Sequence, residues 1–147
     1  MNSDRILRRT WLPLGAALIL ALSAFGLYSS IAAAEDINVT LSGDQAVPPV
    51  KSAGGGTGVI VISTDKTVSG SVTTTGIAGT MAHIHDAAPG KTGPVVIPLT
   101  KSGDTYSVPA GATLTAAKYA SFQAGNLYIN VHTAAHPDGE IRGQLKP

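Results

Sequence analysis

The sequence predicts an all-β protein, a Greek-key-like antiparallel β-sandwich of about eight short strands with one short helix. Short apolar or β-branched segments recur along the chain, and Gly, Pro, Asn or Asp residues separate them. The 17 Gly and 9 Pro supply turns, while a hydrophobic content of 44% supplies a core. A single alanine-rich segment breaks the strand pattern and is the one candidate helix.

The first three strands are expected over residues 37–41, 58–63 and 67–75. Residues 37–41 alternate apolar and polar side chains, which is typical of a strand with one buried face. Val59–Ile62 is continuously apolar, so we expect this strand to be buried on both faces. In the third strand, the spacing of Val68 and Val72 puts them on one face.

Three short strands are expected next, over residues 80–86, 95–100 and 105–108. Pro98 lies inside the second of them. Because proline has no N–H to donate to a neighbouring strand, it marks an edge strand or a strand end. The sequence therefore predicts that residues 95–100 either form an edge strand or end at Pro98.

The candidate helix covers residues 114–124, which are rich in alanine. Thr113 or Thr115 can cap its start, and Gly125 stands where a helix commonly ends. We expect this helix to cross one end of the sandwich.

The last two strands are expected over residues 127–133 and 140–145, around the Asp138-Gly139 turn. In the final strand, alternation puts Ile141 and Leu145 inward. Glu140, Arg142 and Gln144 would then face outward, with Glu140 and Arg142 as a solvated pair. Within the core, Ile84, Ile129, Val131 and Ile141 are expected to be buried.

Residues 1–34 have the composition of a secretory signal peptide. Three arginines precede an uncharged apolar run over residues 11–27, and three alanines precede Glu35 and Asp36. We expect cleavage after Ala34, which leaves residues 35–147 as one domain in the periplasm or the medium. The alternative is an uncleaved amino-terminal membrane anchor. A partial twin-arginine motif at residues 8 and 9 leaves the export route open.

Composition excludes several classes of function. Losing residues 1–34 removes three Arg and one Asp, which changes the formal net charge from +1 to −1. With 13% charged and 5% aromatic residues, the chain lacks the basic surface and stacking platforms of a nucleic-acid binder. The absence of cysteine excludes disulfides, zinc fingers and thiol catalysis. No G-x-S-x-G, P-loop or dinucleotide fingerprint is present, so catalysis is not the favoured interpretation.

The four histidines fall in two places, and they are the best candidates for a site. Because residues i and i+2 share one face of a strand, Met81, His83 and His85 point the same way. His132 ends a later strand and His136 lies in the loop after it. Neutral imidazoles at this spacing can bind one ion of copper, zinc, nickel or iron. A polar strand face without any ligand is the alternative.

Several motifs, in order, make the chain resemble the CHRD domain, which is named after repeats in chordin, a secreted binder of bone morphogenetic proteins. The resemblance covers residues 37–146 and implies an exported single-domain protein. It also implies an alternative function as a non-catalytic extracellular module that binds another protein or acts in adhesion. The motifs that carry it are Gln45-Ala46-Val47-Pro48-Pro49-Val50, Ala82-His83-Ile84-His85, Gly93-Pro94-Val95-Val96, Gly125-Asn126-Leu127-Tyr128-Ile129-Asn130-Val131-His132-Thr133 and Pro137-Asp138-Gly139-Glu140-Ile141-Arg142-Gly143-Gln144-Leu145.

The His-x-His strand with a later strand-end histidine is also distantly similar to copper–zinc superoxide dismutase, in which such histidines bind copper. That enzyme's zinc loop and disulfide cysteines have no counterpart here, so an enzyme of dismutase or oxidase type is the third and least favoured interpretation of the function. The topology that the CHRD resemblance implies brings residues 80–86 beside residues 127–133. We therefore expect His83, His85 and His132 to share one ion, with His136 or Met81 as a fourth ligand.

Copper is the favoured metal and zinc the alternative, because nitrogen and thioether donors are the softest that the chain offers. The expected partners are this metal ion and, in the alternative function, another extracellular protein. We expect neither nucleic acid nor, once the signal peptide is cleaved, a membrane as a partner.

Overall fold

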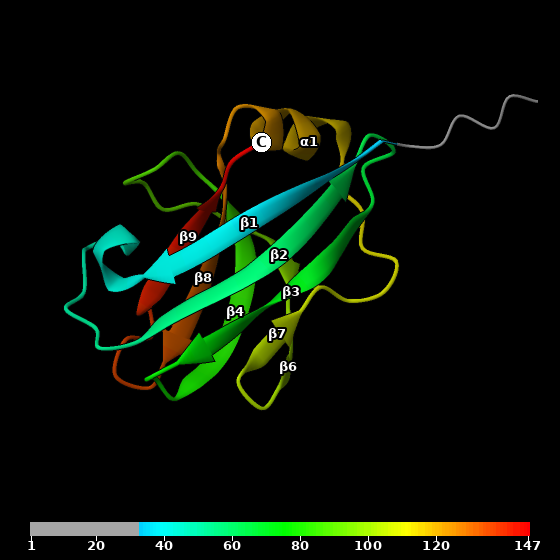
Figure 1. Ribbon diagram of the computed structural model, residues 1–147. Coiled ribbons are helices and arrows are strands. Elements are labelled where there is room, and N and C mark those ends of the chain that lie inside the picture. The colour runs from blue at the N-terminus through cyan, green and yellow to red at the C-terminus, as the bar shows by residue number, and fades with distance from the viewer. Residues whose placement is uncertain (1–32) are drawn as a thin grey trace, which may run out of the picture. The chain divides into compact units, whose positions relative to one another are not determined.

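The computed structural model describes residues 33–147, which form nine strands, one α-helix and one short 3-10 helix (Figure 1). In chain order these elements are β1 (Ala34–Ser42), η1 (Gly43–Gln45), β2 (Gly55–Ser63), β3 (Val68–Thr75), β4 (Gly79–Asp86), β5 (Val95–Pro98), β6 (Thr100–Ser102), β7 (Thr105–Ser107), α1 (Ala116–Gln123), β8 (Leu127–Thr133) and β9 (Ile141–Leu145).

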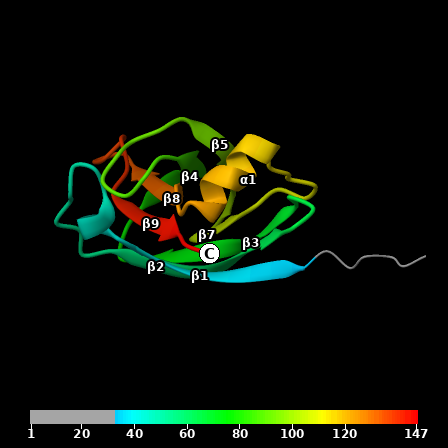
Figure 2. The same ribbon diagram turned by 90° about the horizontal axis from the view of Figure 1, so that it is seen from above.

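All strand pairs are antiparallel, in the order β5-β4-β8-β9-β1-β2-β3-β7-β6. The strands form two layers, with β1, β2, β3 and β7 in one and β4, β8 and β9 in the other (Figures 1 and 2). The layers are joined where Ser42 of β1 pairs with Arg142 of β9. The connections β3–β4 and β7–β8 cross between the layers (Figure 2). The predicted all-β sandwich with one helix is confirmed.

The two border strands lie near each other, so the sheet is almost closed. The backbone N–H of Leu99, between β5 and β6, donates to the carbonyl of Ala82 in β4 at 3.0 Å. The segment predicted as one strand over residues 95–100 is split at Leu99 into β5 and β6. Pro98 ends β5, which lies at one border of the sheet as predicted.

Apolar side chains from both layers meet in one core. The alternation in β1 buries Ile37, Val39 and Leu41 between the layers. The predicted core residues of the other layer are all 0% exposed, namely Ile84, Ile129, Val131 and Ile141. Their prediction is confirmed.

The expectation that β2 is buried on both faces was wrong. Ile60 and Ile62 are buried, but Val59 is 38% exposed and Val61 is only half-buried. β2 lies between β1 and β3, in a layer whose outer side no other described element covers (Figure 2). Its outward side chains, such as Val59, therefore contact solvent. A continuous apolar sequence therefore does not establish that a strand is buried on both faces.

Helix α1 lies at one end of the two layers, as predicted (Figures 1 and 2). The Thr115 hydroxyl accepts a hydrogen bond from the N–H of Lys118 at 3.2 Å and so caps the helix. Gly125 follows the helix with a φ of +72°, a conformation that favours glycine. Phe122 packs into the core, and Lys118 forms an ion pair of 2.6 Å with Asp86 at the end of β4.

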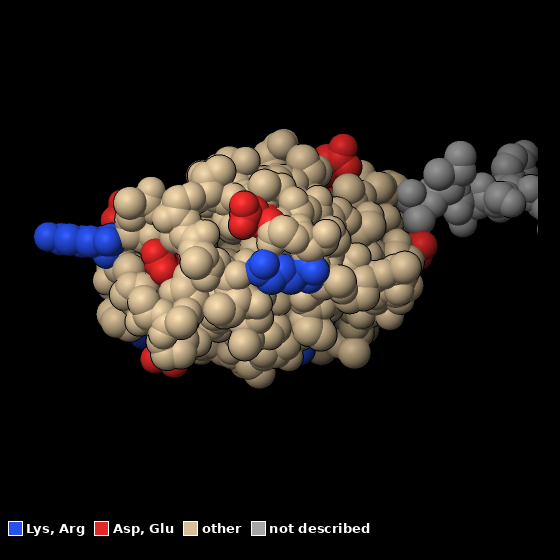
Figure 3. Space-filling model, turned by 90° about the horizontal axis from the view of Figure 1, so that it is seen from below, with Lys and Arg blue, Asp and Glu red and all other residues tan. Residues whose placement is uncertain are grey.

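The predicted signal peptide lies outside the described residues except for Ala33 and Ala34. Glu35, the expected first residue of the exported chain, is the second residue of β1. Within residues 33–147, no helix combines the length and apolarity needed to cross a membrane. The face in Figure 3 carries isolated charged side chains separated by uncharged surface.

Candidate metal centre

Strands β4 and β8 bring three of the predicted histidines together. They pair in a register that places His83 opposite Asn130 and His85 opposite Tyr128. His132 is two residues beyond Asn130, so it is the diagonal neighbour of His83 on the same face. His85 and His132 are each only 8% exposed, and His83 is half-buried.

The imidazole nitrogens are arranged as a group that can hold an ion. One ring nitrogen from each of His83, His85 and His132 lies within 4.8 Å of the others. Nδ1 of His83 and Nε2 of His132 are the closest described pair, at 3.1 Å. Imidazoles that share a metal at about 2.1 Å have nitrogens about 3 to 4 Å apart, so small side-chain rotations complete the geometry.

Backbone carbonyls fix the orientation of two of these rings. Nδ1 of His132 donates to the carbonyl of Pro137 at 2.8 Å, and Nδ1 of His85 donates to the carbonyl of Gly93 at 2.9 Å. Because a carbonyl only accepts, each Nδ1 carries the hydrogen and each Nε2 is the acceptor nitrogen of its ring. Nε2 of His85 has no partner among residues 33–147, whereas Nε2 of His132 accepts a hydrogen bond from Nδ1 of His83 at 3.1 Å. Such carbonyl-held imidazoles are typical of metal ligands.

The proton states of the histidines suit metal binding. Burial lowers the pKa of His83, and the neighbouring His132 and His85 lower it further. Burial also lowers the pKa of His85, against a smaller opposite effect of its hydrogen bond to Gly93. Both rings are therefore neutral at neutral pH, the state in which imidazole binds a metal.

Tyr128 supports His85 from the side. Its ring stacks on the His85 ring with centroids 5.0 Å apart and planes 12° apart. The guanidinium carbon of Arg142 lies 3.5 Å from the centre of the same tyrosine ring. Because β8 runs between β4 and β9, the tyrosine is held between the histidine and the arginine.

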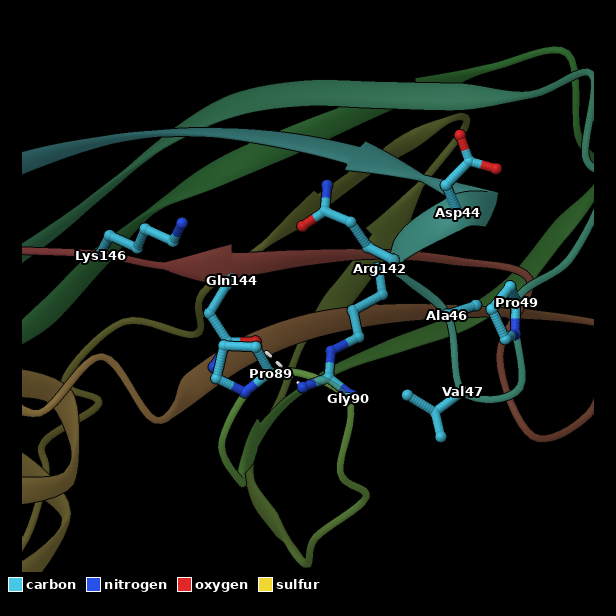
Figure 4. Close-up of a pocket in the computed structure, with 10 residues that line it drawn as sticks. Asp44, Ala46, Val47, Pro49, Pro89, Gly90, Arg142, Gln144 and Lys146 are labelled. Carbon is cyan, nitrogen blue, oxygen red and sulfur yellow. Dashed lines mark hydrogen bonds between the residues drawn. The ribbon is translucent and has the colours of Figure 1, made fainter.

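The expectation of a solvated Arg142 was wrong, since this residue is 2% exposed. Its guanidinium donates to the carbonyls of Lys91 at 2.6 Å and Ala88 at 3.1 Å. It also donates to Oε1 of Gln144 at 3.0 Å (Figure 4). Burial lowers its pKa. The loop over residues 87–93 covers this face of β9, and strand periodicity cannot reveal such a cover.

Glu140 does not pair with Arg142, which corrects the second part of that expectation. Its two carboxylate oxygens accept hydrogen bonds from Ser52 at 2.6 Å and Thr133 at 2.7 Å. These two bonds lower the pKa of Glu140. Glu140 thus ties the loop before β2 to the end of β8.

The other two predicted ligands lie at different places. His136 is in the turn after β8, where its N–H donates to the Thr133 carbonyl at 3.2 Å, and it is not one of the three clustered histidines. Met81 is opposite His132 in the register and is 51% exposed. A ligand role for Met81 stays a prediction.

Sequence reasoning did not identify the groups that hold the ligands in place. Gly93 and Pro137 act through backbone carbonyls, which carry no residue-type signal. Tyr128, Asn130 and His132, which alternate along β8, all line a cavity of about 430 Å³.

The family model of the CHRD domain matches residues 37–145, which is almost all of the described chain. The chain belongs to the CHRD domain family. This CHRD domain thus carries its three-histidine cluster inside the matched region. No curated protein and no solved structure matches the chain, so the likeness to superoxide dismutase has no support from these comparisons.

Proposed function

We propose that this CHRD domain is an exported metal-binding protein that holds one copper ion through His83, His85 and His132, with no catalysis assigned to it. The observation that carries the proposal is the convergence of three imidazoles from two strands, with one nitrogen of each within 4.8 Å of the others.

A metal explains the arrangement better than a polar strand face does. Nε2 of His85 is buried and has no hydrogen-bond partner among residues 33–147. Leaving such a group unpaired costs about 1–3 kcal/mol, so a ligand for it offsets a real penalty. Two carbonyl bonds that hold the Nδ1 hydrogens of His85 and His132, and so leave Nε2 of each ring as the donor atom for a metal, add to this argument.

Copper is favoured over other ions by the donor set. Three neutral imidazoles without a clustered carboxylate suit copper or zinc and not magnesium or calcium. Among divalent ions of the first transition row, copper binds such a site most tightly. The nearby thioether of Met81 would extend the preference to the reduced ion.

Metal titration of the purified protein tests the proposal. We expect one equivalent of copper to bind the wild type, and binding to weaken at least about tenfold in His83→Ala, His85→Ala and His132→Ala. His136→Ala is the matched control, since it removes a histidine outside the cluster, and it should bind as the wild type does. Equal affinity in all five proteins, or loss in His136→Ala alone, would overturn the site.

Export is tested on the protein secreted by its own cells. Its intact mass should correspond to a chain that begins at Glu35, and its metal content should show copper. A mass that retains residues 1–34 would replace export with an anchored domain. Protein that binds no metal at all would favour the non-catalytic interaction or adhesion module that the family resemblance implies.

A further inference from the structure

The three-histidine cluster opens onto a pocket of about 430 Å³. His85 and His132 line this pocket, together with Tyr128, Asn130 and the loop residues Thr92, Gly93, Pro137 and Asp138. A fully enclosed structural metal site would need protein groups around the whole ion. Here, one side of the cluster faces a space large enough for several small molecules.

Two polar groups in the pocket wall have hydrogen-bonding capacity left over. Oδ1 of Asn130 is buried and accepts no hydrogen bond from residues 33–147, whereas its Nδ2 donates to the Asp138 carbonyl at 2.9 Å. The Tyr128 hydroxyl accepts from the Gly93 N–H at 3.2 Å, and no described residue accepts its proton. The residues that line the pocket thus include one buried acceptor without a partner and one hydroxyl whose proton is unassigned, and a ligand that reached both would satisfy them.

We propose that the metal centre keeps an open coordination position in this pocket, where a small oxygen ligand that can both donate and accept a hydrogen bond is held by Asn130 and Tyr128. Water, hydroxide and hydroperoxide belong to this class. The inference rests on the proposed metal site, and it goes further by assigning a second ligand and two residues that position it.

The two side chains act on the ligand in opposite senses. Asn130 Oδ1 accepts from a protonated ligand, so it favours water over an unprotonated anion such as azide. The Tyr128 hydroxyl donates, so it favours a ligand with a lone pair, which azide has. Replacing each residue should therefore shift azide affinity in opposite directions, which a general loosening of the site would not do.

The experiment uses azide as the probe on the copper-loaded full domain. Azide binding is followed by its charge-transfer absorption band, and bound water by its effect on the relaxation of solvent protons. In the wild type, azide should produce the band and abolish the relaxation effect. Asn130→Ala should bind azide about two- to tenfold more tightly, and Tyr128→Phe about two- to tenfold more weakly. Asn38→Ala, an exposed asparagine on β1, is the matched control and should match the wild type.

Copper stoichiometry, measured first for every variant, separates this inference from the site itself. One bound copper with no azide band and no relaxation effect would overturn the open position and leave the metal site standing. Shifts in the same direction in Asn130→Ala and Tyr128→Phe would overturn the roles of the two residues. Wild-type protein that binds no copper would overturn the proposed function, and this inference with it.

Discussion

Arg142 is a buried cation that is satisfied by carbonyl oxygens and an aromatic face. Its guanidinium contacts Ala88, Lys91 and Gln144 and lies over Tyr128. No carboxylate pairs with it among the described residues. The planar guanidinium of Arg142 therefore links the loop over residues 87–93 to strand β9 through several hydrogen bonds at once. The ammonium group of a lysine cannot make the same set of bonds.

Substitution of Arg142 should be costly for this reason. Arg142→Ala should lower the free energy of unfolding by about 2 kcal/mol or more, because three acceptors lose their donor and the stack on Tyr128 is lost. Urea denaturation measures the change. Lys146→Ala, an exposed cation just after the same strand, is the control and should change stability by less than about 0.5 kcal/mol. A loss as small in Arg142→Ala would contradict the buried role.

His83 and His85 make the stability of the metal-free protein depend on pH. The pKa of each is lowered from 6.5, mainly by burial. As the pH falls below about 6.5, these histidines bind protons in the unfolded chain but stay neutral in the folded protein. The free energy of unfolding therefore decreases with decreasing pH, until the pH lies below the folded-state pKa values. Above this range the effect is absent.

Urea midpoints measured between pH 7.5 and pH 5 test this dependence. The double variant His83→Gln and His85→Gln should show a shallower decline than the wild type across this range, because neither glutamine titrates. Parallel declines in the two proteins would show that other groups cause the dependence.

At the scale of elements, strand β2 buries only one of its faces, so adjacent apolar residues of this strand differ in burial. Ile60 is 0% exposed and Val59 is 38% exposed. Ile60→Ala should cost about 2–5 kcal/mol of unfolding free energy, and Val59→Ala less than about 1 kcal/mol. Chemical denaturation gives both values. Equal losses of unfolding free energy in the two variants would contradict the one-sided burial of β2.

The loop over residues 87–93 should control metal affinity through Gly93. A Cβ at this position would collide with the backbone of Asp86, so Gly93→Ala must displace the loop. The carbonyl that orients His85 would move with it, and affinity should fall about 10- to 100-fold in a metal titration.

Gly90→Ala is the control, because a Cβ there meets nothing within 4 Å. Its φ of +74° costs about 1 kcal/mol of stability and should leave metal affinity unchanged. Matching losses of affinity in both variants would mean that general loosening of the loop, and not the Gly93 carbonyl, sets the affinity.

The sequence predicts most of the strands, because alternation and turn residues report local geometry. The strand over residues 127–133 has the predicted limits, and the helix cap is one of the two expected threonines. The histidine group followed from the period of a strand and from family topology. The roles of Arg142, Gly93 and Pro137 could not be predicted, since a distant loop creates them and no local pattern encodes which carbonyl meets which side chain.

At the scale of the whole molecule, a bound metal would join the two strands that frame the site. A ligand that binds only the folded state at about 100 times its dissociation constant adds about 2.7 kcal/mol of stability. Zinc, which has no redox chemistry, should therefore raise the thermal midpoint of the wild type and of His136→Ala, and should raise it much less in His132→Ala. Differential scanning calorimetry gives the midpoints. An equal rise in all three proteins would place the stabilising ion elsewhere.

The near-closure of the sheet also bears on how copies of the domain meet one another. The two border strands, β5 and β6, have four and three residues, and Pro98 removes one donor from the first. The adjacent Leu99 N–H is already bonded to Ala82. Aggregation by β-strand addition needs a long row of unpaired backbone groups, and neither border supplies one. The two ends of the sheet are therefore poor templates for pairing with the strands of another copy, and this protection needs no disulfide.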